Sequence, residues 1–130
     1  MINSNPYQRY QQNAVTSANK GELTLMLYTG AVKFIKLGMK LVEEKNIEGA
    51  NNTIIRVQEI ISHLNDTLNM EYELSNNLAL LYDYINRRLA VANAKKDKQI
   101  LGEVLSLVEE LRDTWAEALK LAVPASAVNL

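Results

Sequence analysis

Cysteine is absent from the 130-residue sequence, and histidine occurs only once. Without cysteine the chain forms no disulfide and offers no thiolate to a metal or a substrate, which is typical of the reducing cytoplasm. A ferritin-like di-iron bundle needs two Glu-x-x-His motifs, so a single histidine excludes it. The five glycines never cluster, so no glycine-rich phosphate loop is present. We therefore expect no metal and no cofactor.

Net charge and long apolar runs are also lacking. The formal net charge is −1, from 14 Lys and Arg against 15 Asp and Glu, so nucleic acid is not an expected partner. No apolar run approaches the roughly 20 residues that cross a bilayer, and the first residues lack the pattern of a secretory signal. With 48% hydrophobic residues the composition is that of one globular domain. We expect a cytoplasmic protein without membrane insertion.

Residues 21–42 form the most informative stretch. Their polar positions fall on one stripe, spaced four, three and four residues apart: Thr29, Lys33, Lys36 and Lys40. A helix on the outside of a domain needs an apolar face only about 100° wide. This stretch is apolar around most of its girth, which predicts a central helix that neighbours contact on several sides. Asn19 and Glu22 have the spacing of a capping box at its start.

Three further helices are predicted by apolar residues at alternating spacings of three and four, which form an apolar seam along each helix. The seams cover about 48–68, 73–94 and 98 onward, and short connections make consecutive helices antiparallel. We expect an all-α fold, an antiparallel up-down-up-down four-helix bundle over residues 19–122, with a flexible N-terminal arm at 1–18 and a flexible tail at 123–130. The seam residues are Ile54, Val57, Ile61, Leu64 and Leu68, then Leu74, Leu78, Leu81, Ile85 and Leu89, then Leu101, Val104, Val108, Leu111, Trp115 and Ala118.

The first 18 residues are polar and rich in Asn and Gln, and they carry Tyr7 and Tyr10. Such a segment is too polar to form a core of its own. It is either a frayed terminus or a strap whose two tyrosines dock on the bundle. The tyrosines favour the strap.

His63 is the one side chain that raises the question of catalysis. It lies two positions after Ile61, off the apolar seam, so we expect it to face solvent. An exposed histidine on a four-helix bundle resembles a histidine phosphotransfer domain, whose site reads His-x-Leu-Lys-Gly. Here the run continues Leu64-Asn65-Asp66-Thr67, and Asp66 would oppose an anionic transition state. A plain surface histidine is the favoured interpretation.

The bundle also has more apolar residues than its core needs. A core takes about three positions in seven on each helix, and further apolar residues lie outside the seams. They either thicken the core or line grooves in which partner helices lie. The pattern predicts an interaction module, not an enzyme, with candidate contacts at Ile55, Leu80, Tyr84, Val91 and Leu107. We expect Tyr28 and Tyr82 to be core residues hydrogen-bonded at one bundle end, and Trp115 to pack against the core.

Several motifs occur together and in order along the chain: Pro6-Tyr7 with Tyr10, Leu25-Met26-Leu27-Tyr28-x-Gly30, Leu81-Tyr82-Asp83-Tyr84-Ile85 and Arg112-x-x-Trp115. In this combination the sequence resembles the FliS family, flagellar secretion chaperones that hold unpolymerised flagellin before export. Lys20 departs from the family pattern, which often has proline at that position.

The resemblance implies a function that the surplus apolar residues can support. The chain would bind the disordered C-terminal segment of flagellin in apolar grooves between helices, prevent premature polymerisation and keep flagellin competent for flagellar type III secretion. The arm, with Tyr7 and Tyr10, would cover the groove when it is empty. The flagellar export gate is a further implied partner, and a monomer or a weak, domain-swapped homodimer is expected. A generic helix-binding module remains the alternative.

Overall fold

Four long helices make up most of the described chain, residues 19–121 of the computed structural model. They are α2 (Lys20–Glu43), α3 (Ile47–Asp66), α4 (Glu73–Lys95) and α5 (Lys98–Leu121), and the described residues contain no strand. The predicted arm at 1–18, with Tyr7 and Tyr10, and the predicted tail at 123–130 lie outside the described residues.

Side-chain caps fix where the helices begin. The Asn19 side chain accepts the backbone N–H of Glu22 at 2.8 Å, and the Glu22 carboxylate accepts that of Asn19 at 3.3 Å, so the predicted capping box is confirmed. Asn46 accepts the backbone N–H of Gly49 at 2.9 Å and starts α3. Asp97 caps α5 in the same way, with a carboxylate oxygen 2.9 Å from the backbone nitrogen of Gln99. Each cap satisfies N–H groups that have no partner inside the helix.

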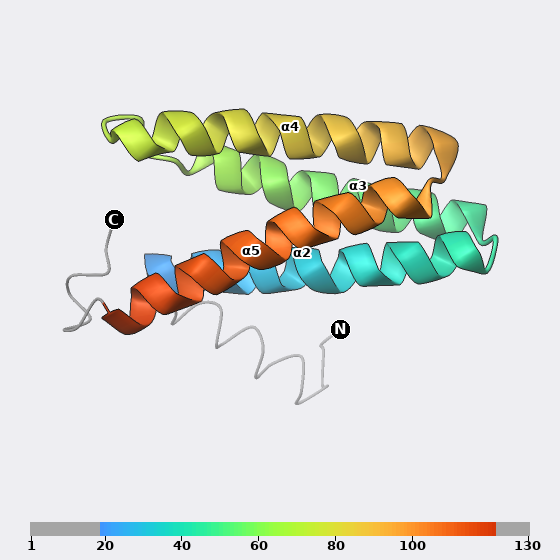
Figure 1. Cartoon of the computed structure of the whole chain (residues 1–130), viewed down its shortest axis with the longest axis horizontal. Helices are drawn as coiled ribbons and strands as arrows, with labels where there is room; N and C mark the ends of the chain where they lie inside the picture. The colour runs from blue at the N-terminus through green and yellow to red at the C-terminus, as the bar shows by residue number, and fades with distance from the viewer. Residues whose placement is uncertain (1–18, 122–130) are drawn as a thin grey trace, which may run out of the picture.

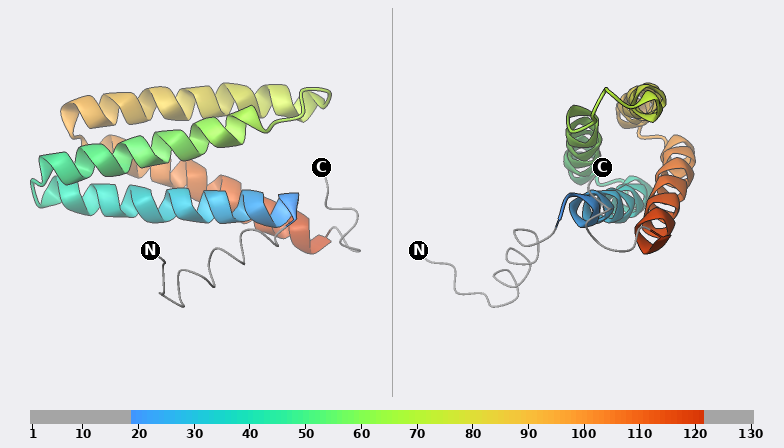
Figure 2. Two further views of the ribbon diagram at one scale, coloured as in Figure 1. Left: turned by 180° about the vertical axis from the view of Figure 1, so that it is seen from behind. Right: turned by 90° about the vertical axis from the view of Figure 1, so that its left-hand side faces the viewer.

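Consecutive helices run antiparallel, as predicted, and lie at the four corners of the bundle (Figures 1 and 2). α2 packs against α3 and α5, and α4 packs against the same two helices from the opposite corner. The predicted stripe of Thr29, Lys33, Lys36 and Lys40 is exposed on the outer face of α2. Met26 and Leu37 are exposed as well. The prediction of a central helix that neighbours contact on several sides was therefore wrong, because α2 lies at a corner of the bundle and packs mainly against two helices.

The predicted seams supply most of the core. The largest fully buried side chains come from all four helices: Ile35, Ile54, Val57, Ile61, Ile85, Leu89, Leu101, Val104 and Val108. The prediction was wrong at two seam positions near one end of the bundle. Leu74 is 64% exposed, and Ala118 is exposed as well.

The spacing between α4 and α5 explains these two exposed seam residues. The helices meet at the tight turn after Lys95 and separate towards the opposite end, where α4 begins and α5 finishes (Figure 1). At that end α5 stands away from the first turns of α4 (Figure 1), although Ser75 in the first turn is buried. The bundle is therefore closed at one end and open at the other.

Candidate partner-binding cleft

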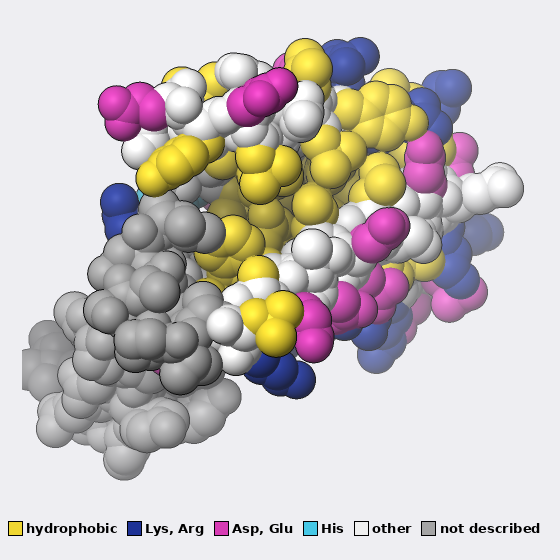
Figure 3. Space-filling view, turned by 60° about the vertical axis from the view of Figure 1, so that its left-hand side comes forward, with side chains coloured by type: hydrophobic (Ala, Val, Ile, Leu, Met, Phe, Trp, Pro, Cys, Tyr) yellow, Lys and Arg dark blue, Asp and Glu magenta, His cyan; other side chains and the backbone are white. Residues whose placement is uncertain are grey.

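An apolar cavity of about 300 Å³ occupies the open end of the bundle. All four helices and the α3–α4 connection contribute to its walls. In the space-filling view, apolar side chains gather over the hollowed face between α4 and α5 (Figure 3). The aliphatic lining consists of Leu23, Leu27, Leu64, Leu68, Leu74 and Leu78.

Two tyrosines from facing helices reach the cavity. Tyr28 of α2 and Tyr82 of α4 are only 2% and 3% exposed, and their hydroxyl groups hydrogen-bond to each other. The prediction that both are core residues hydrogen-bonded at a bundle end is confirmed. Burial raises the pKa of the Tyr28 hydroxyl. Burial, together with the bond to Tyr28, raises the pKa of Tyr82 well above its ordinary value, so both hydroxyls are neutral around pH 7.

Trp115 forms the wall between α5 and α2. Its indole Nε1 donates a hydrogen bond to the carbonyl oxygen of Gly21 at 2.8 Å. The ring packs against the core and lines the cavity. This contact ties the last turns of α5 to the first turn of α2, and it agrees with the packing role predicted for Trp115.

The cavity is also lined by polar and charged side chains. Lys20, His63 and Tyr72 all line it. His63 is exposed, as predicted. Tyr72 and Leu74 are also exposed, next to Met70 in the α3–α4 connection. Exposed apolar residues that continue into an apolar cavity are typical of a surface that a partner covers.

Four of the five predicted contact residues lie along the flanks of α4 and α5 that face each other, outside the cavity lining. The Tyr84 hydroxyl donates to Glu103 across this gap at 2.8 Å. Leu80 lies one turn before Tyr84, Val91 two turns after it, and Leu107 one turn after Glu103, so the four share these flanks. Leu80 is 71% exposed, whereas the other three are half-buried.

Ile55 lies apart from those four residues. It is 40% exposed on α3, between Asn51 and Gln58. Both of these neighbours bond to α4, Asn51 accepting from Asn93 at 2.8 Å and Gln58 donating to the carbonyl oxygen of Asn86 at 3.5 Å. Ile55 therefore belongs to the α3–α4 flank, on the other side of α4.

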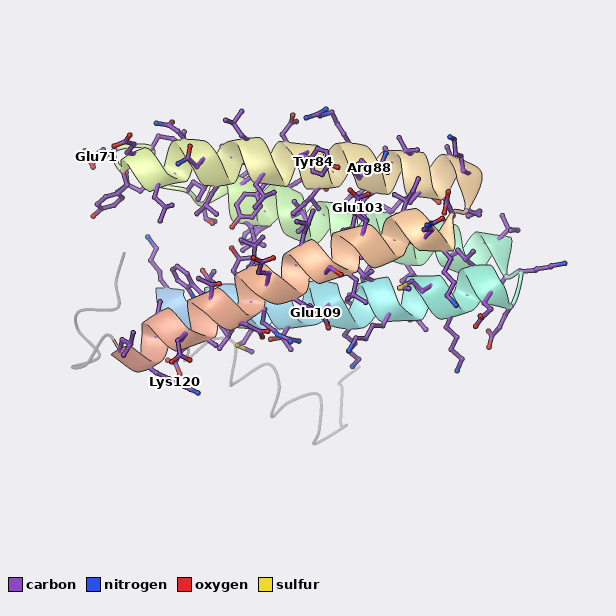
Figure 4. The ribbon with its side chains drawn as sticks, in the orientation of Figure 1. Glu71, Tyr84, Arg88, Glu103, Glu109 and Lys120 are labelled. Carbon is purple, nitrogen blue, oxygen red and sulfur yellow. The ribbon has the colours of Figure 1, made fainter. Side chains whose placement is uncertain are left out.

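A polar cluster bridges α4 and α5 next to the predicted contacts (Figure 4). Arg88 Nη2 lies 3.0 Å from Glu103 Oε1, while Tyr84 bonds to the other carboxylate oxygen. The hydrogen bond from Tyr84, followed by that from Arg88, lowers the pKa of the Glu103 carboxyl group. The same bond raises the pKa of Tyr84. We call Tyr84, Arg88 and Glu103 the α4–α5 clasp.

Apolar periodicity did not predict the cavity itself. Leu64, Leu78 and Trp115 lie on the predicted seams, and the pattern assigned them to packing. Periodicity indicates which face of a helix points inward, but not how far apart two helices stand at one end. The exposed residues of the α3–α4 connection, Met70 and Tyr72, were the available signal.

Within residues 19–121, no three His, Asp or Glu side chains gather closely enough to hold a metal ion. None of the four described helices has the length and apolarity needed to cross a membrane.

Comparisons with known proteins agree with one another. The family model described as "Flagellar protein FliS" matches residues 3–122. The chain is 47% identical over 120 residues to the flagellar secretion chaperone FliS of Bacillus subtilis, covering 92% of this chain and 90% of the relative. It is 32% identical to the chaperone of the same name from Escherichia coli, covering 83% and 82% of the two chains. A crystal structure of a bacterial flagellar chaperone matches with a TM-score of 0.74 at 20% identity, over 88% of this chain and 94% of that one.

Proposed function

Because the chain belongs to the FliS family of flagellar secretion chaperones, we propose that it binds the C-terminal segment of flagellin along the open side of its bundle. The observation that carries this proposal is the apolar cavity between all four helices, which continues into exposed apolar residues at its rim. An amphipathic helix can bury its apolar face in such a groove. The proposed role is binding, without a catalytic step.

The proposed mechanism is concealment of the surface that starts the filament. Flagellin segments left free in the bacterial cytoplasm would pair with one another through their apolar faces. A segment held in the cleft is withheld from polymerisation and stays competent for flagellar type III secretion. Ordering a disordered segment costs about 2–5 kcal/mol of the gross interaction energy, which keeps the complex dissociable at the export gate.

The predicted contacts extend the proposed binding surface beyond the cavity. Beyond the cavity, the facing flanks of α4 and α5 carry four of them: Leu80, Tyr84, Val91 and Leu107. Ile55 lies on the α3–α4 flank, so a segment that touches it as well must pass around α4. We propose that the bound segment occupies the cavity and follows the α4–α5 flanks, with Ile55 as a peripheral contact.

The experiment that tests this function is a calorimetric titration with the C-terminal segment of flagellin from the same organism, with circular dichroism recorded in parallel. Tight one-to-one binding with a gain in helix is the expected result. Binding without new helix would retain the chaperone role and remove the folding of the segment on binding. No binding to the folded bundle would overturn the proposal.

A matched pair of substitutions tests whether the cavity is the binding surface. Leu74 is 64% exposed and lines the cavity near the start of α4. Ile47 is 55% exposed at the start of α3, outside the cavity lining. Both tolerate aspartate, since an acidic residue is favourable in the first turn of a helix. We expect Leu74→Asp to weaken binding at least about tenfold, the cost of lost apolar burial, and Ile47→Asp to leave it unchanged.

We also propose that the N-terminal arm, through Tyr7 and Tyr10, occupies the groove until flagellin displaces it. Tyrosine suits such a contact because its large ring is apolar and its tip is polar. Deleting residues 1–16 should tighten binding or speed association, as measured by stopped-flow fluorescence. Unchanged kinetics, together with an arm that proteases do not cleave, would contradict this role.

A further inference from the structure

The cavity wall includes a pair of tyrosines whose bond to each other does not use all of their hydrogen-bonding groups. A tyrosine hydroxyl has one hydrogen to donate and lone pairs to accept with. The bond between Tyr28 and Tyr82 uses one of the two hydroxyl hydrogens. Among residues 19–121 neither hydroxyl has another hydrogen-bond partner. The pair therefore retains one donor and at least one acceptor site, in a cavity whose other walls are largely apolar.

An unpaired polar group has a large effect in such surroundings. Leaving a buried donor without an acceptor costs more than a hydrogen bond normally gains. Water can satisfy the hydroxyls while the cavity is open, but a partner that fills the cavity displaces that water. The partner must then supply the missing hydrogen bonds, or the complex loses affinity. Because burial raises the pKa of both hydroxyls, their hydrogens are retained around pH 7.

We propose that the Tyr28–Tyr82 pair is a polar subsite that binds the side-chain amide of an asparagine or glutamine on the apolar face of the flagellin segment. This inference rests on the proposed function and adds a specificity determinant to it. A primary amide has a carbonyl acceptor and an N–H donor, which match the free hydrogen and the free lone pair of the tyrosine pair.

The main-chain carbonyls and the carboxylates of a bound helix fit this subsite less well. Main-chain carbonyls within a helix are already bonded to N–H groups four residues on, so they are not available to the cavity. A carboxylate would lose its hydration in apolar surroundings, at a high cost. A segment with only aliphatic side chains would leave the remaining donor and acceptor sites of the tyrosine pair without a partner. The subsite therefore selects the position of one amide and fixes the register of the segment.

The double variant Tyr28→Phe/Tyr82→Phe tests the subsite. It removes both hydroxyls and keeps both rings, and replacing both partners of a buried bond with apolar groups is often nearly neutral for folding. We expect an intact bundle by circular dichroism and about tenfold weaker binding of the flagellin segment by calorimetry. Thr53→Val is the matched control, because it removes a buried hydroxyl at a position outside the cavity lining. Its affinity should stay within about twofold of wild type.

A second set of variants, in the flagellin segment, separates recognition from mere packing. Each asparagine is replaced with leucine and each glutamine with methionine, one at a time, and each peptide is titrated against both forms of the chaperone. One substitution should weaken binding to the wild-type chain and have no further effect on the double phenylalanine variant, which is the signature of direct coupling. Equal affinity of the wild-type and double-variant chains, or no coupled amide, would overturn the subsite and leave the proposed function standing. Failure of the wild-type chain to bind any segment would overturn both.

Discussion

At the open end of the bundle, Trp115 connects α5 directly to α2. It lies on the seam of α5, where packing was expected, and its indole N–H adds a bond to the Gly21 carbonyl oxygen at 2.8 Å. This bond joins two residues that lie 94 positions apart in the sequence. The cavity wall between α5 and α2 thus depends on one side chain.

Replacing Trp115 with phenylalanine should lower the free energy of unfolding by about 1–2 kcal/mol, because the indole bond and part of the packing are lost. Urea denaturation followed by circular dichroism measures the change. Thr114→Ser, at an exposed position on the same turn, should stay within about 0.5 kcal/mol of wild type. A Trp115→Phe variant as stable as wild type would show that the Gly21 bond contributes nothing.

Single residues were predictable from the sequence where periodicity and chemistry pointed the same way. Tyr28 and Tyr82 fall among apolar neighbours on two helices and need a polar partner when buried, so their burial and bonding could be inferred. The exposure of Leu74 could not be inferred, because its spacing in the sequence is that of a core residue. Its environment depends on where α5 lies, and no local pattern encodes that position.

At the scale of a helix, the start of α2 was predictable from the sequence, whereas some helix ends were not. The spacing of Asn19 and Glu22 was sufficient to predict the capping box that the structure contains. Lys20, the first helical residue, stands where the family often has proline, so this cap must fix the helix start without a constrained backbone. Helix ends without special cap residues were less predictable. α3 finishes at Asp66, two residues before the predicted end, with the Thr67 hydroxyl donating to the Leu64 carbonyl oxygen.

Asn19→Ala should destabilise the chain by about 1 kcal/mol, because the backbone N–H of Glu22 loses the side-chain oxygen that accepts it. The thermal midpoint should fall by several degrees for a domain of this size. Asn52→Ala provides the control, since Asn52 is exposed inside α3 and alanine favours a helix interior. Loss of stability in both variants alike would rule out the cap as the cause.

The whole molecule combines a closed end with an open one, and the α4–α5 clasp lies along the gap between the helices that separate. Tyr84 and Arg88 hold Glu103 at 2.8 and 3.0 Å. Their bonds tie the two helices together beside the region where they diverge. The bundle and its antiparallel order followed from four amphipathic seams and short connections. The separation of α4 and α5 at one end did not follow from the sequence, since it depends on side chains of these two helices that lie far apart in the sequence.

Because of the α4–α5 clasp, we expect the stability of the folded chain to depend on pH, with a sign that follows from the pKa of Glu103. Its pKa is lower in the folded chain than the ordinary value of 4.5, so the carboxylate favours folding above that value. This contribution is lost as the pH falls through the lower, folded pKa. Wild type should therefore exceed Glu103→Gln in urea midpoint at pH 7, and the gap should close towards pH 3. Glu110→Gln, on an exposed part of the same helix, should show no comparable gap at pH 7.

The position of the α2 cap has a consequence for the affinity of the proposed flagellin binding. Asn19 is in an extended conformation, with φ −76° and ψ 175°, and the next two residues already line the cavity. The proposed N-terminal arm would therefore be attached close to the cavity mouth, where a short flexible linker would give an effective concentration of about millimolar. A proposed arm with even weak intrinsic affinity would occupy the cavity for much of the time. The apparent dissociation constant for flagellin would then be the intrinsic one divided by the fraction of chains whose cavity is vacant, so tether length would set affinity without altering any contact.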